Sequence, residues 1–113
     1  MNKVNSRKLA DKLLKNLCLY ESYAEYYACL EKNGSIPPRK AQEARLRAEH
    51  YRETARAARK ALEHLNATKR SIIELLYFTP GMTVDDVCDK TALERSSVYR
   101  YRASALDKIS AAT

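Results

Sequence analysis

The stretch TVDDVCDKTALERSSVYRYRASALDKI, residues 83–109, decides the expected fold. Its first half opens with Thr83, whose hydroxyl can accept hydrogen bonds from the free amides of a first helical turn at Asp85 or Asp86. A short apolar face follows. The sequence therefore predicts a short helix over about residues 84–90, and then a tight turn in which Leu93 packs between two helices.

The second half of this stretch has the pattern of a longer amphipathic helix, over about residues 95–110. Apolar residues recur every three or four positions, at Val98, Ala105, Leu106 and Ile109. Between Val98 and Ala105, either Tyr101 or Arg102 occupies the position that continues this pattern. Two helices joined by so short a turn form a helix-turn-helix, whose second helix enters the major groove of DNA with its first residues. The residues expected to contact DNA from that helix are Arg95, Ser96, Ser97, Tyr99 and Arg100.

Read without a gap, residues 65–109 resemble region four of bacterial sigma factors. Leu65 and Asn66 stand where the family has Leu-Pro, and the helix that follows them matches at Arg70, Ile72, Ile73, Leu75, Leu76 and Tyr77. Thr83 to Val87 correspond to the family's Thr-Leu-x-Glu-Ile, and Val98 matches in the second helix of the motif. Ala105, Leu106 and Lys108 correspond to its Ala-Leu-x-Lys ending. The chain is also similar in length and layout to small phage activators of the ArpU and RinA type. The resemblance implies a three-helix DNA-binding domain in a transcription regulator of phage or mobile-element origin.

The chain departs from the family's pattern in the turn. Ala92 stands for the turn glycine, Thr91 for the leucine before it, and Glu94 for the serine that caps the recognition helix. We therefore expect a turn that differs in detail and a cap that shifts to Ser96. Tyr99 stands where sigma factors commonly have arginine. The guanidinium of arginine can form two hydrogen bonds with guanine, whereas tyrosine offers an aromatic ring and one hydroxyl. Base preference is therefore not transferred from the family.

Further residues of the C-terminal half are expected at the DNA backbone, where contacts fix position without reading sequence. They are Thr83, Lys69, Arg70 and Lys108. Residues 68–113 carry seven basic and six acidic groups, so this half has little net positive charge. Two alternatives therefore stay open: an interaction protein that docks on RNA polymerase or another regulator without reading DNA, and the DNA-recognition part of a small terminase subunit. A helix that only closes a small bundle would also show this pattern.

Composition indicates an all-α protein with an anionic partner. The 113 residues include only two glycines and three prolines, and their formal net charge is +7. A charge of this sign most often indicates nucleic acid and less often a membrane surface, although solubility alone also explains it. The three cysteines and two histidines have neither metal-ligand nor disulfide spacing, and neither a signal peptide nor a membrane-spanning run is recognised. We expect a cytoplasmic protein that is not an enzyme and has no cofactor, metal or membrane partner.

Residues 1–64 are predicted to form a long antiparallel helical hairpin, followed by residues 65–113 as the helix-turn-helix domain. The first helix is expected over about residues 6–32 and the second over about residues 38–65, with Asn33 and Gly34 ending the first. The inward stripe of the second helix is mostly alanine, which lets two helix axes approach closely. This stripe is Ala41, Ala44, Ala48, Tyr51, Ala55, Ala58, Leu62 and Leu65.

Two surfaces of this hairpin each have two alternative roles. The first helix has more large apolar residues than an alanine-lined partner covers, so they either pack on the C-terminal domain or form a homo-oligomer. These residues are Leu14, Cys18, Tyr23, Tyr26 and Leu30. The second helix carries a basic ridge, made of Arg45, Arg52, Arg56 and Arg59. The ridge is either a solvated face held by the ion pairs Glu43–Arg47, Glu49–Arg52 and Arg59–Glu63, or a second phosphate-contacting surface.

Overall fold

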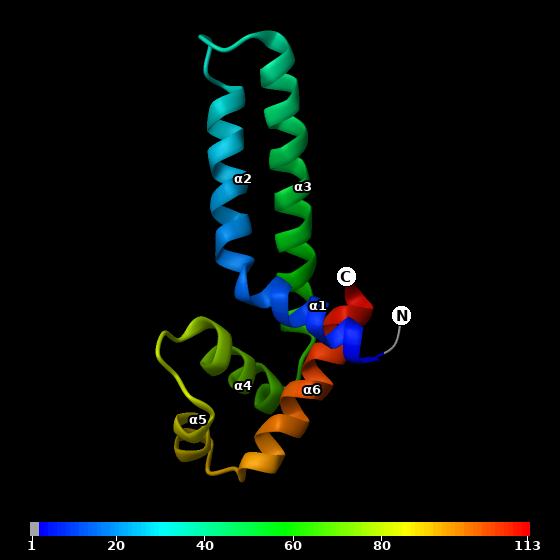
Figure 1. The fold of residues 1–113 in the computed structure, drawn as a ribbon, viewed down its shortest axis with the longest axis vertical. Coiled ribbons are helices and arrows are strands. Elements are labelled where there is room, and N and C mark those ends of the chain that lie inside the picture. Colours follow the sequence, from blue (N-terminus) through cyan, green and yellow to red (C-terminus); the bar gives the residue numbers. More distant parts are fainter. Residues whose placement is uncertain (1–2) are drawn as a thin grey trace.

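The computed structural model describes residues 3–113 and consists there of helices, with no strand in that part of the chain. The helices are α1 (Lys3–Lys15), α2 (Leu17–Glu31), α3 (Pro38–Glu63), α4 (Ala67–Phe78), α5 (Val84–Thr91) and α6 (Arg95–Ala112). The predicted all-α class is therefore confirmed. The molecule is elongated, with extents of 56 × 31 × 20 Å. Figure 1 shows α2 and α3 projecting as an arm from a body that contains α1, α4, α5 and α6.

In the arm, α2 and α3 lie side by side and antiparallel (Figure 1). The helix α3 begins at the predicted Pro38, because Pro37 has extended backbone angles and a proline at the first helical position costs no hydrogen bond. Most of the buried residues that α3 turns toward α2 are alanines, so the two axes approach closely. Three tyrosine rings of α2 gather around Tyr51 of α3, with ring centroids 5.3 to 6.0 Å apart.

The predicted single helix over residues 6–32 is wrong, because the chain breaks at Asn16 into α1 and α2. The side-chain amide of Asn16 donates to the carbonyl oxygen of Lys12 at 2.8 Å, and its backbone amide donates to the same oxygen at 3.1 Å. A side chain that competes for backbone partners in this way ends regular helix. As a result α1 leaves the direction of α2 and runs across the base of the arm (Figure 1).

The helix α1 packs on α6 and forms part of the main apolar core. Leu14, which the sequence left either on the C-terminal domain or in an oligomer contact, is only 1% exposed and belongs to this core. The other members come from both ends of the chain and from the base of the arm, and they are Ala10, Leu17, Ala55, Ala58, Ala61, Leu62, Leu65, Ile73, Ala105, Leu106 and Ile109. The core therefore fixes the position of α6 from three directions.

Candidate nucleic-acid interface

The helices α5 and α6 begin at the residues that the sequence predicted. At the start of α5, the Asp86 amide donates to the Thr83 hydroxyl at 3.2 Å, and the Thr83 amide donates to the Asp86 carboxylate at 3.0 Å. This reciprocal capping box satisfies two amides that the helix leaves free, and it confirms the predicted cap. Hydrogen bonds to the Thr83 amide and hydroxyl lower the pKa of Asp86, so its carboxylate stays ionised at the positive end of α5.

The turn between α5 and α6 comprises residues 92–94. Ala92 has a left-handed backbone, with φ of 58° and ψ of 27°, at the position where the sigma family has glycine. Leu93 packs on a small second core made of Ile72, Val87 and Val98, as predicted for the residue between the two helices. The expected shift of the cap to Ser96 is wrong, because α6 begins at Arg95 and the Val98 amide already donates to the Glu94 carbonyl.

The predicted contact residues at the start of α6 divide between two sides of the helix. Arg95 and Tyr99, one turn apart, lie together, with the guanidinium 5.9 Å from the ring centroid. Arg95 also pairs with Asp85 of α5 at 2.7 Å, so one α5 carboxylate holds the first arginine of α6. Arg100 is exposed elsewhere on α6 and lies 5.6 Å from the ring centroid of Tyr101.

The remaining predicted residues of this surface differ in how far solvent reaches them. Ser96 is exposed and Ser97 is half-buried in the first turn of α6. Arg70 is exposed and pairs with Glu74 one turn along α4, at 3.2 Å. Thr83 is exposed, but its hydroxyl is occupied in the capping box.

Lys69 of α4 and Lys108 of α6 lie beside each other at the other end of α6. Desolvation and the ammonium group of Lys108 both lower the pKa of Lys69. Two ammonium groups so close repel each other, and an anion between them would relieve that repulsion.

A charged network that the sequence analysis missed joins α1 to α6. Arg102 of α6 donates to Asp11 of α1 at 2.9 Å and to the Tyr77 hydroxyl of α4 at 3.1 Å, and that hydroxyl donates to Asp11. Arg7 and Asp107 form a second link, with two hydrogen bonds of 2.8 and 2.9 Å. The sequence contained one indication of this network. Arg102 lies on the apolar face of the predicted helix over residues 95–110, and an arginine that is partly buried there needs a carboxylate partner.

The network shifts the titration of two of its members. Burial alone would raise the pKa of Asp11, but hydrogen bonds from Tyr77, Lys15 and Arg102 outweigh it and hold that pKa below its ordinary value. Burial and the bond to Asp11 raise the pKa of Tyr77 to about 12. At neutral pH the carboxylate is therefore ionised and the phenol is neutral, which suits the bonds that each one makes.

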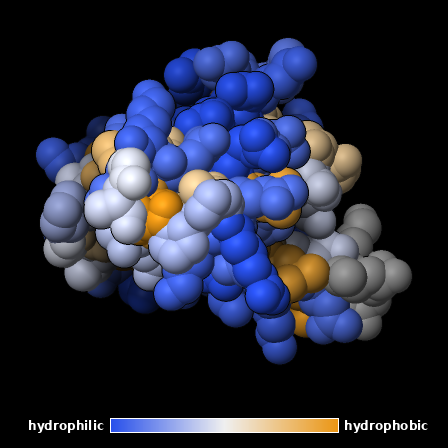
Figure 2. All heavy atoms as spheres, turned by 90° about the horizontal axis from the view of Figure 1, so that it is seen from above, coloured by the Kyte–Doolittle hydropathy of each residue, from blue (hydrophilic) through white to orange (hydrophobic). Residues whose placement is uncertain are grey.

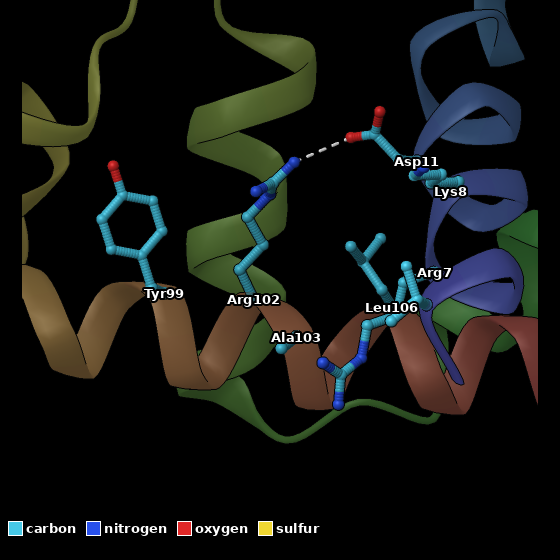
Figure 3. Close-up of a pocket in the computed structure, with 8 residues that line it drawn as sticks. Arg7, Lys8, Asp11, Tyr99, Arg102, Ala103 and Leu106 are labelled. Carbon is cyan, nitrogen blue, oxygen red and sulfur yellow. Dashed lines mark hydrogen bonds and ion pairs between the residues drawn. The ribbon is translucent and has the colours of Figure 1, made fainter. Parts of the chain in front are cut away.

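Above this network a hollow of about 340 Å³ opens between α1 and α6 (Figure 3). In Figure 3, Tyr99 and Arg102 extend from the same side of α6, with Arg102 directed at Asp11 and Tyr99 open to the space beside it. Lys8 of α1 lines the same hollow. The side of α6 that carries Arg95 and Tyr99 thus continues onto a basic edge of α1.

None of the three ion pairs expected on α3, Glu43–Arg47, Glu49–Arg52 and Arg59–Glu63, forms among the described residues. Arg59 donates to Glu21 of α2 at 2.7 and 3.1 Å instead of pairing with Glu63, and Glu43 pairs with Arg39 instead of Arg47. The other ridge arginines, Arg45, Arg52 and Arg56, are exposed along the arm. Figure 2, seen from the end at which α2 and α3 are joined, shows mostly hydrophilic residues with apolar ones between them.

Among residues 3–113, no three His, Cys, Asp or Glu side chains gather as metal ligands would, and none of the described helices is long and apolar enough to cross a membrane. No protein-family profile, curated protein or solved structure matches the chain. The likeness to sigma region four therefore rests on the residues quoted from the sequence.

Proposed function

We propose that the protein is a sequence-specific DNA-binding transcription regulator, with α4, α5 and α6 as a helix-turn-helix domain of the sigma-region-four type. The observation that carries the proposal is the solvent-open start of α6. A short capped α5 supports that helix from one side and the body core holds it from beneath. A recognition helix needs this combination, because its first turns must enter the major groove while its remainder stays fixed.

The two arginines of α6 have different roles in this proposal. Arg100 is exposed and not bound to a carboxylate of the described residues, so its guanidinium is available for a bidentate contact with guanine. Arg95 must leave Asp85 before it contacts a base. Because a contact with a base has to compensate for the lost ion pair, Arg95 binds well only where the base accepts hydrogen bonds as strong as those of Asp85, which makes this contact selective.

Contacts with the DNA backbone are assigned to the Lys69 and Lys108 pair and to the basic edge of α1. Desolvation and the neighbouring Lys108 lower the pKa of Lys69, and a phosphate bound between the two lysines would offset the part that comes from Lys108. The start of α6 and the loop between α2 and α3 lie at opposite ends of the molecule (Figure 1). DNA bound by α6 therefore does not reach Arg45 near that loop, and we assign the basic ridge to solvent.

An interaction protein that docks on RNA polymerase without reading DNA is the second candidate. It is favoured by the ion pairs that already occupy Arg95 and Arg70, and by the near-neutral charge of residues 68–113. In that case the open start of α6 would be a protein-docking surface. The two candidates differ in a measurable quantity, which is the salt-dependent affinity of the chain for duplex DNA.

The test is to enrich bound sites from random duplex DNA and to titrate the enriched and a scrambled duplex by fluorescence anisotropy at several salt concentrations. A DNA reader shows a preferred site and an affinity that falls with salt. The Arg100→Ala variant should lose about 1–3 kcal/mol on the enriched duplex and little on the scrambled one. The Lys108→Ala variant should weaken both and lower the salt slope by about one.

The matched control is Arg45→Ala, which removes an exposed arginine from the arm and should leave both titrations unchanged. The Arg95→Ala variant should reduce discrimination between the duplexes, since it removes the proposed selective contact. If no site is enriched, and if neither Arg95→Ala nor Lys108→Ala changes binding, the docking candidate replaces the DNA-binding one.

A further inference from the structure

The solvent side of α2 carries a row of four large residues, here named the α2 stripe: Leu19, Tyr23, Tyr26 and Leu30. They follow one another at steps of four, three and four, which places them along one side of a helix. Leu19 is 45%, Tyr23 39% and Tyr26 59% exposed, and Leu30 is half-buried. Within residues 3–113, α3 packs on the adjacent side of α2. It touches the edge of the stripe at Tyr23, whose ring centroid lies 5.3 Å from that of Tyr51, and it leaves Leu19 and Tyr26 open to solvent.

The α2 stripe has the same order of residue types and the same spacing when it is read in either direction. A two-fold axis passing between Ala24 and Glu25 therefore sets Leu19 opposite Leu30 of a second copy, and Tyr23 opposite Tyr26 of that copy. An antiparallel pair of identical helices requires this self-complementarity, because each residue must fit the partner that the symmetry assigns to it. Steps of four and three are also the spacing at which paired helices interlock their side chains.

Charge does not oppose this pairing of copies. The helix α2 has three glutamates and no lysine or arginine, so two copies of it would repel each other if the glutamates lay in the contact. At helical spacing, Glu21 and Glu25 lie on the side of α2 away from the stripe. Glu21 is also paired with Arg59 of α3, at 2.7 Å.

The area of the stripe fits a reversible dimer. The exposed parts of these four side chains amount to roughly 400 Å² on each copy, so a dimer through the stripe alone buries at most about 800 Å² in total, which is in the range of weak, transient contacts. Tyrosine is also among the residues that are enriched in such interfaces. A contact of this size is weak, so we expect it to form reversibly and only at high concentrations of the chain.

We propose that α2 of one copy packs antiparallel on α2 of a second copy, through the α2 stripe and with the two-fold axis between Ala24 and Glu25. This refines the assembly role expected of the N-terminal helices, and it does not depend on whether α6 reads DNA. An antiparallel pair of α2 helices places the two bodies at opposite ends of the joined arms. Within each copy, the start of α6 lies at the end of the molecule away from the loop between α2 and α3 (Figure 1).

The test is sedimentation equilibrium of the full chain without DNA, over about 1 to 500 µM. The parent should show a monomer–dimer equilibrium. The Leu19→Lys and Leu30→Glu variants should each weaken it by about tenfold or more, because each buries one unpaired charge per contact. The double variant Leu19→Lys/Leu30→Glu keeps the net charge of the parent. It should dimerise at least about threefold more tightly than either single variant, because each introduced lysine then faces an introduced glutamate.

The matched control is Leu46→Lys, which changes a leucine of α3 that is 56% exposed and lies outside the stripe. It should dimerise like the parent, and the helical circular dichroism of every variant should match that of the parent. A parent that stays monomeric at the highest concentration, an assembly larger than a dimer, or a double variant no tighter than the single ones overturns the proposal. DNA titrations of the same variants at nanomolar protein report separately on α6.

Discussion

The arm and the body bury different kinds of residue. Seven large side chains are almost completely inaccessible, and all but Leu17 at the base of the arm lie in the body: Leu14, Leu17, Ile72, Ile73, Val87, Val98 and Ile109. Most of the buried residues of the arm are alanines, and its larger side chains are tyrosines that remain partly open. Because burial of a large side chain stabilises by about 1.5–3 kcal/mol, most of the stabilisation by burial lies in the body and at the base of the arm. The arm gains less from burial and keeps side chains free for another molecule.

The largest expected effect tests whether α1 belongs to the body. The Leu14→Ala variant should lower the free energy of unfolding by about 2–5 kcal/mol, since Leu14 is 1% exposed in the main core. Denaturant titration monitored by circular dichroism measures this loss. Leu9→Ala is the matched control on the same helix, because Leu9 is 55% exposed, and it should change stability by no more than about 0.5 kcal/mol. Equal effects of the two changes would place α1 outside the core.

The next effect tests whether alanine determines how closely the arm helices pack. Ala48 is 3% exposed between α2 and α3, so the Ala48→Leu variant overfills the contact and should cost about 1–3 kcal/mol. Gln42→Leu, an exposed change on the same helix, is the control and should have little effect on the midpoint of denaturant unfolding. A variant Ala48→Leu as stable as the parent would show that the arm does not depend on close approach of its helices.

Much of this fold could be predicted because its signals are local. Proline at the first turn set the start of α3, and Thr83 with Asp86 set the start of α5. The break at Asn16 could not be predicted from periodicity, since the apolar pattern continues through it and neither glycine nor proline marks it. It depends on a side-chain hydrogen bond to Lys12 and on the core that α6 offers to α1.

The positions of the candidate interface residues on α6 were predictable, but their contacts were not. Helical spacing was enough to place Arg95 and Arg100 near the start of α6. The pair between Arg95 and Asp85 depends on how α5 meets α6, which no local pattern encodes. The links of Arg102 to Asp11 and Tyr77 cross from one end of the chain to the other, so only the folded arrangement shows them.

A smaller effect tests whether charge as well as apolar burial attaches α1 to the body. The Asp11→Asn variant should lose about 1–2 kcal/mol of stability at pH 7, because it removes the ionised acceptor shared by Tyr77, Lys15 and Arg102. The folded-state pKa of Asp11 lies below its ordinary value of 3.8, so this stabilisation is present above that pH and is lost as the pH falls through the folded-state pKa.

Thermal unfolding of parent and variant across this pH range measures the difference. The gap between them should be widest near neutral pH and close as the pH falls below about 4. Glu74→Gln is the control, because it removes an exposed carboxylate paired within α4, and it should leave stability nearly unchanged. A gap of constant size from pH 7 to the acid end would mean that Asp11 contributes packing and not charge.

The smallest effect concerns the turn between α5 and α6. Ala92 has a φ of 58°, a left-handed conformation that costs an L-residue about 1–2 kcal/mol and costs glycine nothing. Part of this gain is offset because glycine loses more entropy on folding, so the Ala92→Gly variant should be more stable than the parent by about 0.5–1 kcal/mol. Ala103→Gly, the same change within α6, is the matched control and should be less stable by about 1 kcal/mol. Opposite signs for these two changes in denaturant titrations identify the turn as a strained point of the body. If Ala92→Gly instead destabilises the protein as Ala103→Gly does, Ala92 does not have a left-handed conformation. The ion pair between Asp85 and Arg95, which depends on the path of that turn, would then be contradicted as well.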